Sequence, residues 1–233
     1  MSPRPEKTLG VLGGMGPAAT AEFLRILAQD APARLDQEHP RVIMVSEPAI
    51  PDRTQAILGV GDDPSPMLQD ELHRLIDWGA DILAVPCNTA HYFIDRFRAT
   101  FSVPLVHIIE ATVLAAMKAS PEGAWLLSTS GTRNSGLYPA YAQKVGYRFL
   151  DPTDAQQEKV QQSLVLVKAG KLHEAGVVLK GVAEELWRQE DVLIATACTE
   201  LPLAYAASGL PKEKEVSSLQ ALSDACLKIL YKK

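Results

Sequence analysis

The chain has 233 residues, of which 47% are hydrophobic, and its formal net charge is −5 at pH 7. No basic stripe stands out, which argues against nucleic acid and anionic membrane surfaces as partners. No apolar run reaches the roughly 18 residues that cross a membrane. The first residues, "MSPRPEKTLG", lack the apolar core of a signal peptide, so we expect a cytoplasmic protein.

Short apolar runs alternate with amphipathic segments along the first half of the chain. We expect buried strands at 8–14, 41–47 and 81–86. Helical periodicity predicts helices at 16–31, 65–80 and 89–101. The run 105–119 is expected to begin as a strand and to continue as a helix.

The cycle restarts near residue 123. Residues 131–146 are expected to form a loop that enters a helix, and strands are expected at 123–129, 147–152 and 191–196. Helical patterns cover 156–190, with a break around Gly170 and Lys171, and then 199–208 and 217–233. Apolar strands that alternate with helices are typical of an α/β fold with parallel sheets covered on both faces.

The restart indicates an internal duplication. Cys87 and Cys198 occupy corresponding places in the two copies, 111 residues apart (198 − 87). We therefore expect two pseudo-symmetric lobes, each a mostly parallel sheet flanked by helices. The expected first lobe comprises residues 1–103 and 212–233, and the expected second lobe comprises 104–211.

Each duplicated cysteine follows an apolar strand and precedes a helix. Ligands of open parallel sheets bind at the carboxyl ends of the strands, and a helix start favours an anion and lowers the pKa of a thiol. We predict that Cys87 and Cys198 belong to a functional site, although each could instead be a small buried hydrophobic residue. Cys226 lies on the apolar side of the last helix, where burial is the better interpretation. Three cysteines do not suggest a disulfide framework.

Metal and nucleotide sites are poorly supported by the motifs. Cys87 and His91 are four residues apart, but the chain has no CxxC or HxxxH pattern. The stretch "LGGMGPAAT" lacks both GxGxxG and the GK[ST] ending of a phosphate-binding loop. It fits a glycine turn around Met15 that brings the backbone close to a small ligand, or simply a tight strand–helix connection.

Cationic and polar residues follow several predicted strands. Arg53 lies in a proline-constrained loop, where its planar guanidinium suits a carboxylate. Lys168 could act similarly from the second lobe, although on pattern alone both are ordinary surface residues. Hydroxyl and amide side chains that could contact an anionic ligand are Asn88, Thr89, Thr129, Thr132, Ser135 and Thr199.

Five stretches, in order along residues 9–203, resemble the aspartate racemase branch of the aspartate/glutamate racemase family: "GGMGPAAT", "PDRT", "PCNTAHYF", "GT..S..Y" and "CTELPL". The resemblance implies a racemase that uses no cofactor and places two cysteines on opposite faces of its substrate, in a cleft between two lobes. It also implies a small dicarboxylic amino acid, most closely aspartate, as the substrate, and a homodimer.

By this resemblance, Cys87 and Cys198 are the two acid/base residues, and Arg53 and Lys168 meet the side-chain carboxylate of the substrate. The residues implied to meet its α-carboxylate or amine are Asn88, Thr89, Thr132 and Thr199. The expected substrate-binding set is completed by Met15, Thr129 and Glu200. Related glutamate racemases carry an aspartate near Gly13 and a histidine at the position of Glu200, so this departure favours the aspartate branch.

Several alternatives stay open on the sequence alone. A broad-specificity aspartate/glutamate racemase is the nearest one, followed by hydantoin racemase, arylmalonate decarboxylase and maleate isomerase-like enzymes. The intact thiol pair argues against a one-cysteine decarboxylase. A non-catalytic binder of a small carboxylate is the alternative from another class, and it would need neither thiol.

Overall fold

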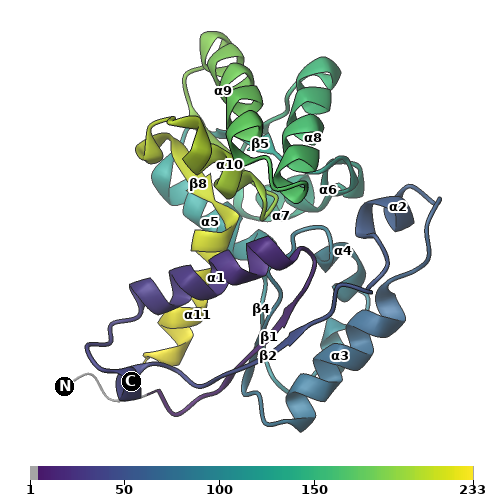
Figure 1. Ribbon diagram of the computed structural model, residues 1–233, viewed down its shortest axis with the longest axis vertical. Coiled ribbons are helices and arrows are strands. Elements are labelled where there is room, and N and C mark those ends of the chain that lie inside the picture. The colour runs from purple at the N-terminus through teal and green to yellow at the C-terminus, as the bar shows by residue number, and fades with distance from the viewer. Residues whose placement is uncertain (1–4, 233) are drawn as a thin grey trace.

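The computed structural model describes residues 5–232 and contains two four-stranded parallel sheets (Figure 1). The first sheet has the strand order β2-β1-β3-β4 and the second has the order β6-β5-β7-β8. Each lobe thus places its second strand outermost, followed by its first, third and fourth, which confirms the duplicated α/β fold. The strands are β1 Leu9–Gly13, β2 Val42–Ser46, β3 Ile82–Ala84, β4 Leu105–Val106, β5 Ala124–Leu127, β6 Phe149–Leu150, β7 Leu193–Thr196 and β8 Glu215–Ser217.

Helices connect the strands and flank the sheets, as parallel pairing requires. In Figure 1 the second lobe, with α8 and α9, occupies the upper half, and the first sheet with α3 occupies the lower half. The α-helices are α1 Pro17–Asp30, α2 Arg53–Ile57, α3 Ser65–Asp77, α4 His91–Ile94, α5 Ile108–Ala119, α6 Ser130–Ser135, α7 Leu137–Val145, α8 Asp154–Lys168, α9 Leu172–Gln189, α10 Leu201–Ser208 and α11 Ser218–Leu230. The 3₁₀ turns are Asp36–Glu38, Arg98–Thr100 and Lys212–Lys214.

Four segments differ from the sequence-based prediction, and one of them is strand β8, which lies where no strand was expected. The helix expected over 89–101 is only α4 followed by the 3₁₀ turn 98–100. The loop expected from residue 131 is instead helical from Ser130, because the Thr129 hydroxyl caps α6 by accepting from the Thr132 amide. Arg53 begins a short helix, since the Asp52 side chain accepts a hydrogen bond from the amide of Gln55.

The strand pairing places both connections between the lobes later in the chain than the predicted boundaries after residues 103 and 211. β4 lies after residue 103 but pairs with β3 in the first sheet. β8 lies after residue 211 but pairs with β7 in the second sheet. The polypeptide therefore passes to the second sheet after β4 and leaves that sheet after β8, and α11 then packs against α1 and α5.

The two lobes share a hydrophobic core. One cluster of buried side chains combines Leu9 and Val11 of β1 with Leu126 of β5, Tyr138 of α7 and Leu222 of α11. A second cluster fills the space between the second sheet and α8–α10, and a third lies between the first sheet and α3. Because the first cluster spans both sheets, the relative placement of the lobes is fixed by packing.

A second contact between the lobes joins α2 to α6. A Cβ atom added at Gly131 would lie 2.7 Å from the hydroxyl of Thr54 and 2.9 Å from its Cα atom. Only a glycine at position 131 therefore permits this close approach. The contact places the start of α2, with Arg53, beside the second lobe (Figure 1).

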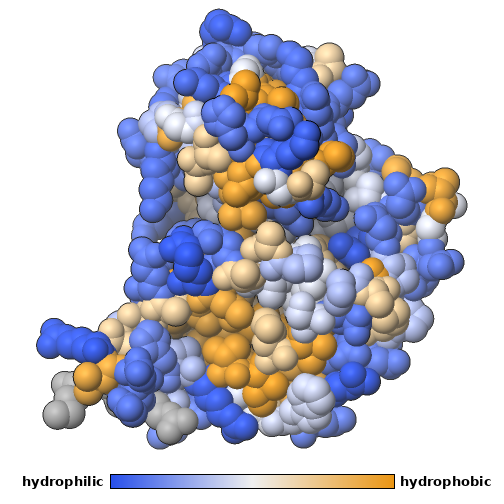
Figure 2. Space-filling model, in the orientation of Figure 1, coloured by the Kyte–Doolittle hydropathy of each residue, from blue (hydrophilic) through white to orange (hydrophobic). Residues whose placement is uncertain are grey.

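The outer edge of the first sheet is apolar and partly exposed. In Figure 2 hydrophobic side chains gather on the lower part of the face shown, over the region of β1 and β2. Met44 of the edge strand β2 is 42% exposed, and Val42, Ile43 and Val45 are partly buried.

Candidate active site

The two cysteines at corresponding strand ends occupy matching positions in the structure. Cys87 follows β3 and Cys198 follows β7, and each of these strands pairs with the first strand of its own sheet. Both side chains are almost fully buried, with exposed fractions of 6% and 5%. The duplication therefore brings one thiol from each lobe to the carboxyl end of its sheet.

The structure corrects the expected acidity of these thiols. Burial raises the pKa of Cys87, and the positive charge of Arg53 opposes this increase. Burial, followed by the negative charge of Glu200, raises the pKa of Cys198 well above its ordinary value. The expected helix-start effect is outweighed because α4 spans four residues and the thiols are removed from water.

Glu200 links the second thiol to the first lobe. One carboxylate oxygen, Oε2, accepts hydrogen bonds from the Cys198 thiol at 3.1 Å and from the Thr199 hydroxyl at 3.2 Å. The other oxygen, Oε1, accepts from the amide of Gly16 at 3.2 Å. The side chain is 4% exposed. Glu200 is therefore a fixed carboxylate at the boundary between the lobes.

A pocket of about 590 Å³ lies at this boundary. Both lobes contribute to it, since Arg53 comes from α2 and Lys168 from the last residue of α8. The residues that line it are Gly14, Gly16, Pro17, Ala18, Pro48, Ile50, Asp52, Arg53, Val167, Lys168 and Glu200. The volume suits a small ligand. Cys198 adjoins this pocket through its hydrogen bond to Glu200.

Arg53 is held in place by the backbone and keeps one donor free. Its Nη1 atom donates to the carbonyl oxygens of Ile50 and Pro51, each at 3.0 Å. Its Nε atom is buried and makes no hydrogen bond of normal length, while the guanidinium lies close enough to Cys87 to oppose the increase that burial causes in the pKa of that thiol. A buried donor without a partner is costly, and a carboxylate bound in the pocket would satisfy it. Lys168 is exposed and provides a second positive charge on the pocket wall.

Three threonine hydroxyls meet between the lobes. The Thr89 oxygen lies 3.1 Å from that of Thr129 and 2.8 Å from that of Thr132. The hydroxyl of Thr129 donates to that of Thr132 at 3.1 Å. The structure thus brings these three predicted residues together, while Thr199 faces Glu200 instead.

Asn88 and Met15 have mainly structural surroundings. Asn88 Nδ2 donates to the Ser218 hydroxyl at 3.1 Å, and Asn88 Oδ1 accepts from the Tyr138 hydroxyl at 2.7 Å. Met15 is 4% exposed and packs into the core of the first lobe. The pocket is lined by its neighbours Gly14 and Gly16 rather than by Met15. Gly14 has φ +92, a conformation that favours glycine.

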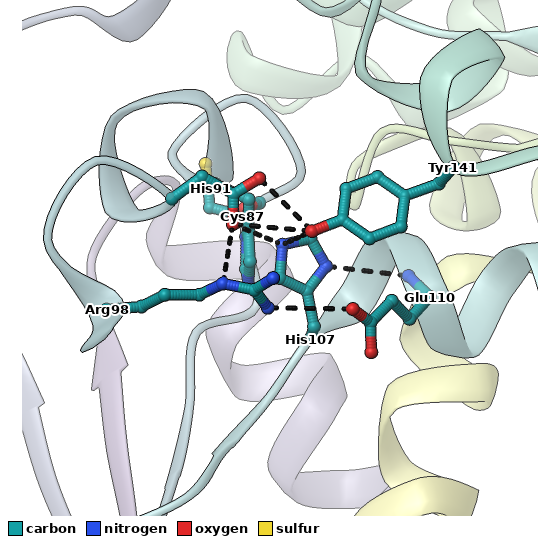
Figure 3. Close-up of polar contacts among 7 residues, drawn as sticks. Cys87, His91, Arg98, His107, Glu110 and Tyr141 are labelled. Carbon is teal, nitrogen blue, oxygen red and sulfur yellow. Dashed lines mark hydrogen bonds and ion pairs between the residues drawn. The ribbon is translucent and has the colours of Figure 1, made fainter. Parts of the chain in front are cut away.

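A buried polar network lies behind Cys87 and was not predicted (Figure 3). His91 Nδ1 is 2.8 Å from the carbonyl oxygen of Cys87, and its ring meets that of His107 edge-to-face at 4.5 Å. His107 Nε2 lies 3.1 Å from Asp95, which also accepts from the hydroxyl of Tyr141 at 3.2 Å. Tyr141 comes from α7, so the network supports the Cys87 loop from both lobes.

The chemistry of this network follows from its hydrogen bonds. Because a carbonyl oxygen only accepts, His91 Nδ1 carries the proton, and the buried Nε2 atom has no partner. Burial lowers the pKa of His91 to about 3. His91 is therefore neutral and acts as a hydrogen-bond donor to the Cys87 backbone.

Cys226 is separate from this arrangement, as predicted. It is fully buried inside α11, and burial raises its pKa to about 12. Within residues 5–232, no group of three or more His, Cys, Asp or Glu side chains could hold a metal ion. In the same part of the chain, no helix is long and apolar enough to cross a membrane.

Comparisons with known proteins find relatives that match most of the chain. Residues 12–221 match the family model described as Asp/Glu/Hydantoin racemase. The chain is 26% identical to the broad specificity amino-acid racemase RacX of Bacillus subtilis (strain 168) over 200 residues, which cover 83% of this chain and 85% of that protein.

Solved structures share the fold over almost the whole chain. The Picrophilus torridus aspartate racemase superposes with a TM-score of 0.85 at 28% identity, over 97% of this chain and 95% of that one. PH1733, an aspartate racemase homologue from Pyrococcus horikoshii OT3, superposes with a TM-score of 0.75 at 20% identity, over 97% of this chain and 100% of that one. The second likeness concerns the fold alone.

Proposed function

The chain belongs to the Asp/Glu/Hydantoin racemase family, and from this premise we propose that it interconverts L- and D-aspartate with Cys87 and Cys198 as the two acid/base residues. The observation that carries the proposal is the pair of buried thiols at equivalent strand ends of two duplicated lobes. Binding alone would need neither thiol, so the pair argues against a carboxylate receptor.

The reaction requires acid/base groups on two faces of one carbon. One thiolate removes the proton from Cα, and the electron pair of the broken C–H bond moves into the adjacent carboxylate. The thiol on the opposite face then gives its proton to Cα as the pair returns. Each thiol ends the turnover in the protonation state that the other had at its start. One thiol from each of the two duplicated lobes would meet this requirement.

The developing negative charge needs fixed donors, because the proposed reaction uses no cofactor as an electron sink. The hydroxyl cluster of Thr89, Thr129 and Thr132 and the backbone amides of the glycine turn are suited to this role. Donors that are already oriented stabilise such an intermediate strongly in a site removed from water.

The charges of the pocket support a dicarboxylic amino acid as the substrate. Arg53 and Lys168 offer two cations to two carboxylates, and the free Nε donor of Arg53 suits a bidentate contact. Glu200 lines the same pocket and adds a negatively charged group to its wall. A broad-specificity racemase remains the second candidate, because RacX, to which the chain is similar over most of its length, is described as having broad specificity.

We also expect a homodimer on the basis of the family resemblance. The apolar edge strand β2, with Met44 42% exposed, supports an association of this kind. Light scattering should give twice the chain mass of 25.3 kDa, whereas a mass of one chain would contradict this assembly.

A panel of enantiopure amino acids tests the proposed substrate. The purified protein is incubated without added cofactor, and chiral chromatography follows the loss of optical purity. We expect racemisation of aspartate to be faster than that of glutamate and of uncharged amino acids. Comparable rates for many side chains would favour the broad-specificity alternative, and no racemisation of any amino acid would overturn the proposal.

A further inference from the structure

The two thiols have different neighbours at equivalent sequence positions. The residue two positions after Cys198 is Glu200, whose carboxylate accepts a hydrogen bond from that thiol at 3.1 Å. The residue two positions after Cys87 is Thr89, whose hydroxyl faces other threonines. The duplication therefore placed a negative charge beside one thiol and a neutral hydroxyl at the corresponding place beside the other.

The contact between Cys198 and Glu200 fixes the position of a proton. A carboxylate is an acceptor, so a hydrogen bond between these groups requires the proton to be on sulfur. If the thiol lost this proton, a sulfur anion and a carboxylate would face each other at 3.1 Å in a site removed from water. The Gly16 amide and the Thr199 hydroxyl hold the carboxylate in this position.

Cys87 has the opposite electrostatic surroundings. After burial, the largest influence on its pKa is the positive charge of Arg53, which lowers it, and the negative charge of Glu200 has the smaller, opposite effect. Other titratable or charged groups near the site are Lys168 and Asp52 on the pocket wall and Tyr138, whose pKa is raised by burial. The exposed Asp52 and Lys168 are of opposite sign.

We propose that Glu200 is a catalytic residue that keeps Cys198 protonated in the free enzyme, so that Cys87 is the first of the two thiols to ionise and acts as the base, while Cys198 acts as the acid. This assignment rests on the racemase function proposed above. It makes the two faces of the site unequal before any substrate binds.

The cycle that follows is balanced in protons and electrons. The Cys87 thiolate takes the Cα proton, the electron pair passes through the substrate carboxylate and back to Cα, and the Cys198 thiol gives its proton to the opposite face. The enzyme is then left with a Cys87 thiol and a Cys198 thiolate beside Glu200. Repulsion from Glu200 favours the return of one proton to Cys198 and the loss of one from Cys87, through solvent.

The test must report on the thiols directly. Because a racemisation has an equilibrium constant of one, kcat/KM stays equal for the two enantiomers in every variant. We therefore suggest alkylation with iodoacetamide as a function of pH, with mass spectrometry to resolve the two cysteine peptides. Thiolate absorbance in the ultraviolet gives the summed titration of the cysteines without dependence on reagent access, and its change in the Glu200→Gln variant reports on Cys198.

In the wild-type protein, we expect Cys87 to be alkylated at a lower pH than Cys198. Glu200→Gln keeps the shape of the side chain but removes the charge, and it should raise the alkylation rate of Cys198 at pH 8 by about tenfold, equivalent to one pKa unit. Glu200→Asp keeps the charge and should remain closer to wild type. Glu158→Gln removes a charge from an exposed position on α8 and should change neither profile.

The outcomes separate this inference from the function on which it rests. If wild-type protein racemises an amino acid but Cys198 titrates below Cys87, or if Glu200→Gln leaves the Cys198 titration unchanged in a variant whose thermal unfolding shows it to be folded, the role of Glu200 is wrong. If wild-type protein racemises nothing, the proposed function fails whatever the thiol titrations show.

Discussion

The hydroxyl of Thr89 in the first lobe lies 2.8 Å from the hydroxyl of Thr132 in the second. This contact crosses the boundary between the lobes within two residues of Cys87. It joins the loop that carries the first thiol to the start of α6 in the second lobe. The position of that loop therefore depends on both halves of the duplicated fold.

Thr132→Val should weaken catalysis more than stability. The change keeps the side-chain shape but removes a buried hydroxyl, so we expect a loss of about 1 kcal/mol in the free energy of unfolding. We expect kcat/KM for aspartate to fall by about tenfold or more, because the hydroxyl proposed to stabilise the developing negative charge is lost. Urea unfolding and chiral chromatography provide the two measurements.

A matched control for this variant is Ser163→Ala. The Ser163 hydroxyl is also buried, and it donates to the carbonyl of Ala175 between α8 and α9. It should lower stability by a similar amount and leave racemisation unchanged. Equal losses of activity in the two variants would show that the effect of Thr132 is only structural.

Tyr141→Phe tests the network behind Cys87. The change removes the hydroxyl that contacts Asp95 and His107, so the imidazole pair loses part of its support. We expect a loss of about 1 kcal/mol in stability together with a lower kcat. Tyr147→Phe removes a comparable hydroxyl bond, to the carbonyl of Ser120, and should reduce stability without affecting kcat. A normal kcat in Tyr141→Phe would show that the network behind Cys87 does not contribute to catalysis.

Arg53→Ala tests recognition of the side-chain carboxylate. Loss of a hydrogen bond to a charged group costs about 1.5–3 kcal/mol, so kcat/KM for aspartate should fall by about tenfold to a hundredfold. Racemisation of alanine, if detectable in the wild type, should fall less, because it loses only the effect of the Arg53 charge on Cys87 and not a contact with a side-chain carboxylate. Arg25→Ala, at an exposed ion pair on α1, is the control. Equal losses for aspartate and alanine would show that Arg53 does not read the side chain.

Glu215 should make the stability depend on pH. Burial raises its pKa from 4.5 to about 7, so the folded state retains a proton that the unfolded state has lost. The contribution of Glu215 to the free energy of unfolding is therefore fully present below pH 4.5 and is lost as the pH rises through about 7. Glu215→Gln should flatten this part of the curve in urea unfolding. If the dependence of the unfolding free energy on pH is unchanged in this variant, groups other than Glu215 determine it.

The sequence could predict every strand except β8, because buried parallel strands are apolar throughout, and it correctly placed Cys87 and Cys198 at equivalent strand ends. The lobe boundaries were less predictable, since β4 and β8 are too short to give a clear pattern. The missed helix α2 did have a local signal, because Asp52 and Gln55 form a capping contact in "PDRTQ".

Contacts between distant segments could not be predicted. Glu200 and Gly16 are 184 residues apart in sequence, and their hydrogen bond depends on how the two lobes pack. The same holds for Tyr141 and Asp95, which are 46 residues apart. The prediction that both thiols have a lowered pKa was wrong for a related reason. The strand–helix pattern indicates a nearby helix dipole, but it does not show how completely the sulfur atom is buried.

Racemisation of L-aspartate in heavy water, followed by mass spectrometry of each enantiomer at early times, tests the two-thiol mechanism most directly. We predict that the D-aspartate formed carries deuterium at Cα while the remaining L-aspartate keeps its hydrogen, because one thiol removes the proton and the other supplies a solvent-derived deuteron. Cys87→Ser and Cys198→Ser should each abolish racemisation, and Cys226→Ser should not. Early D-aspartate that retains the original hydrogen, or full activity in either of the first two variants, would contradict the mechanism.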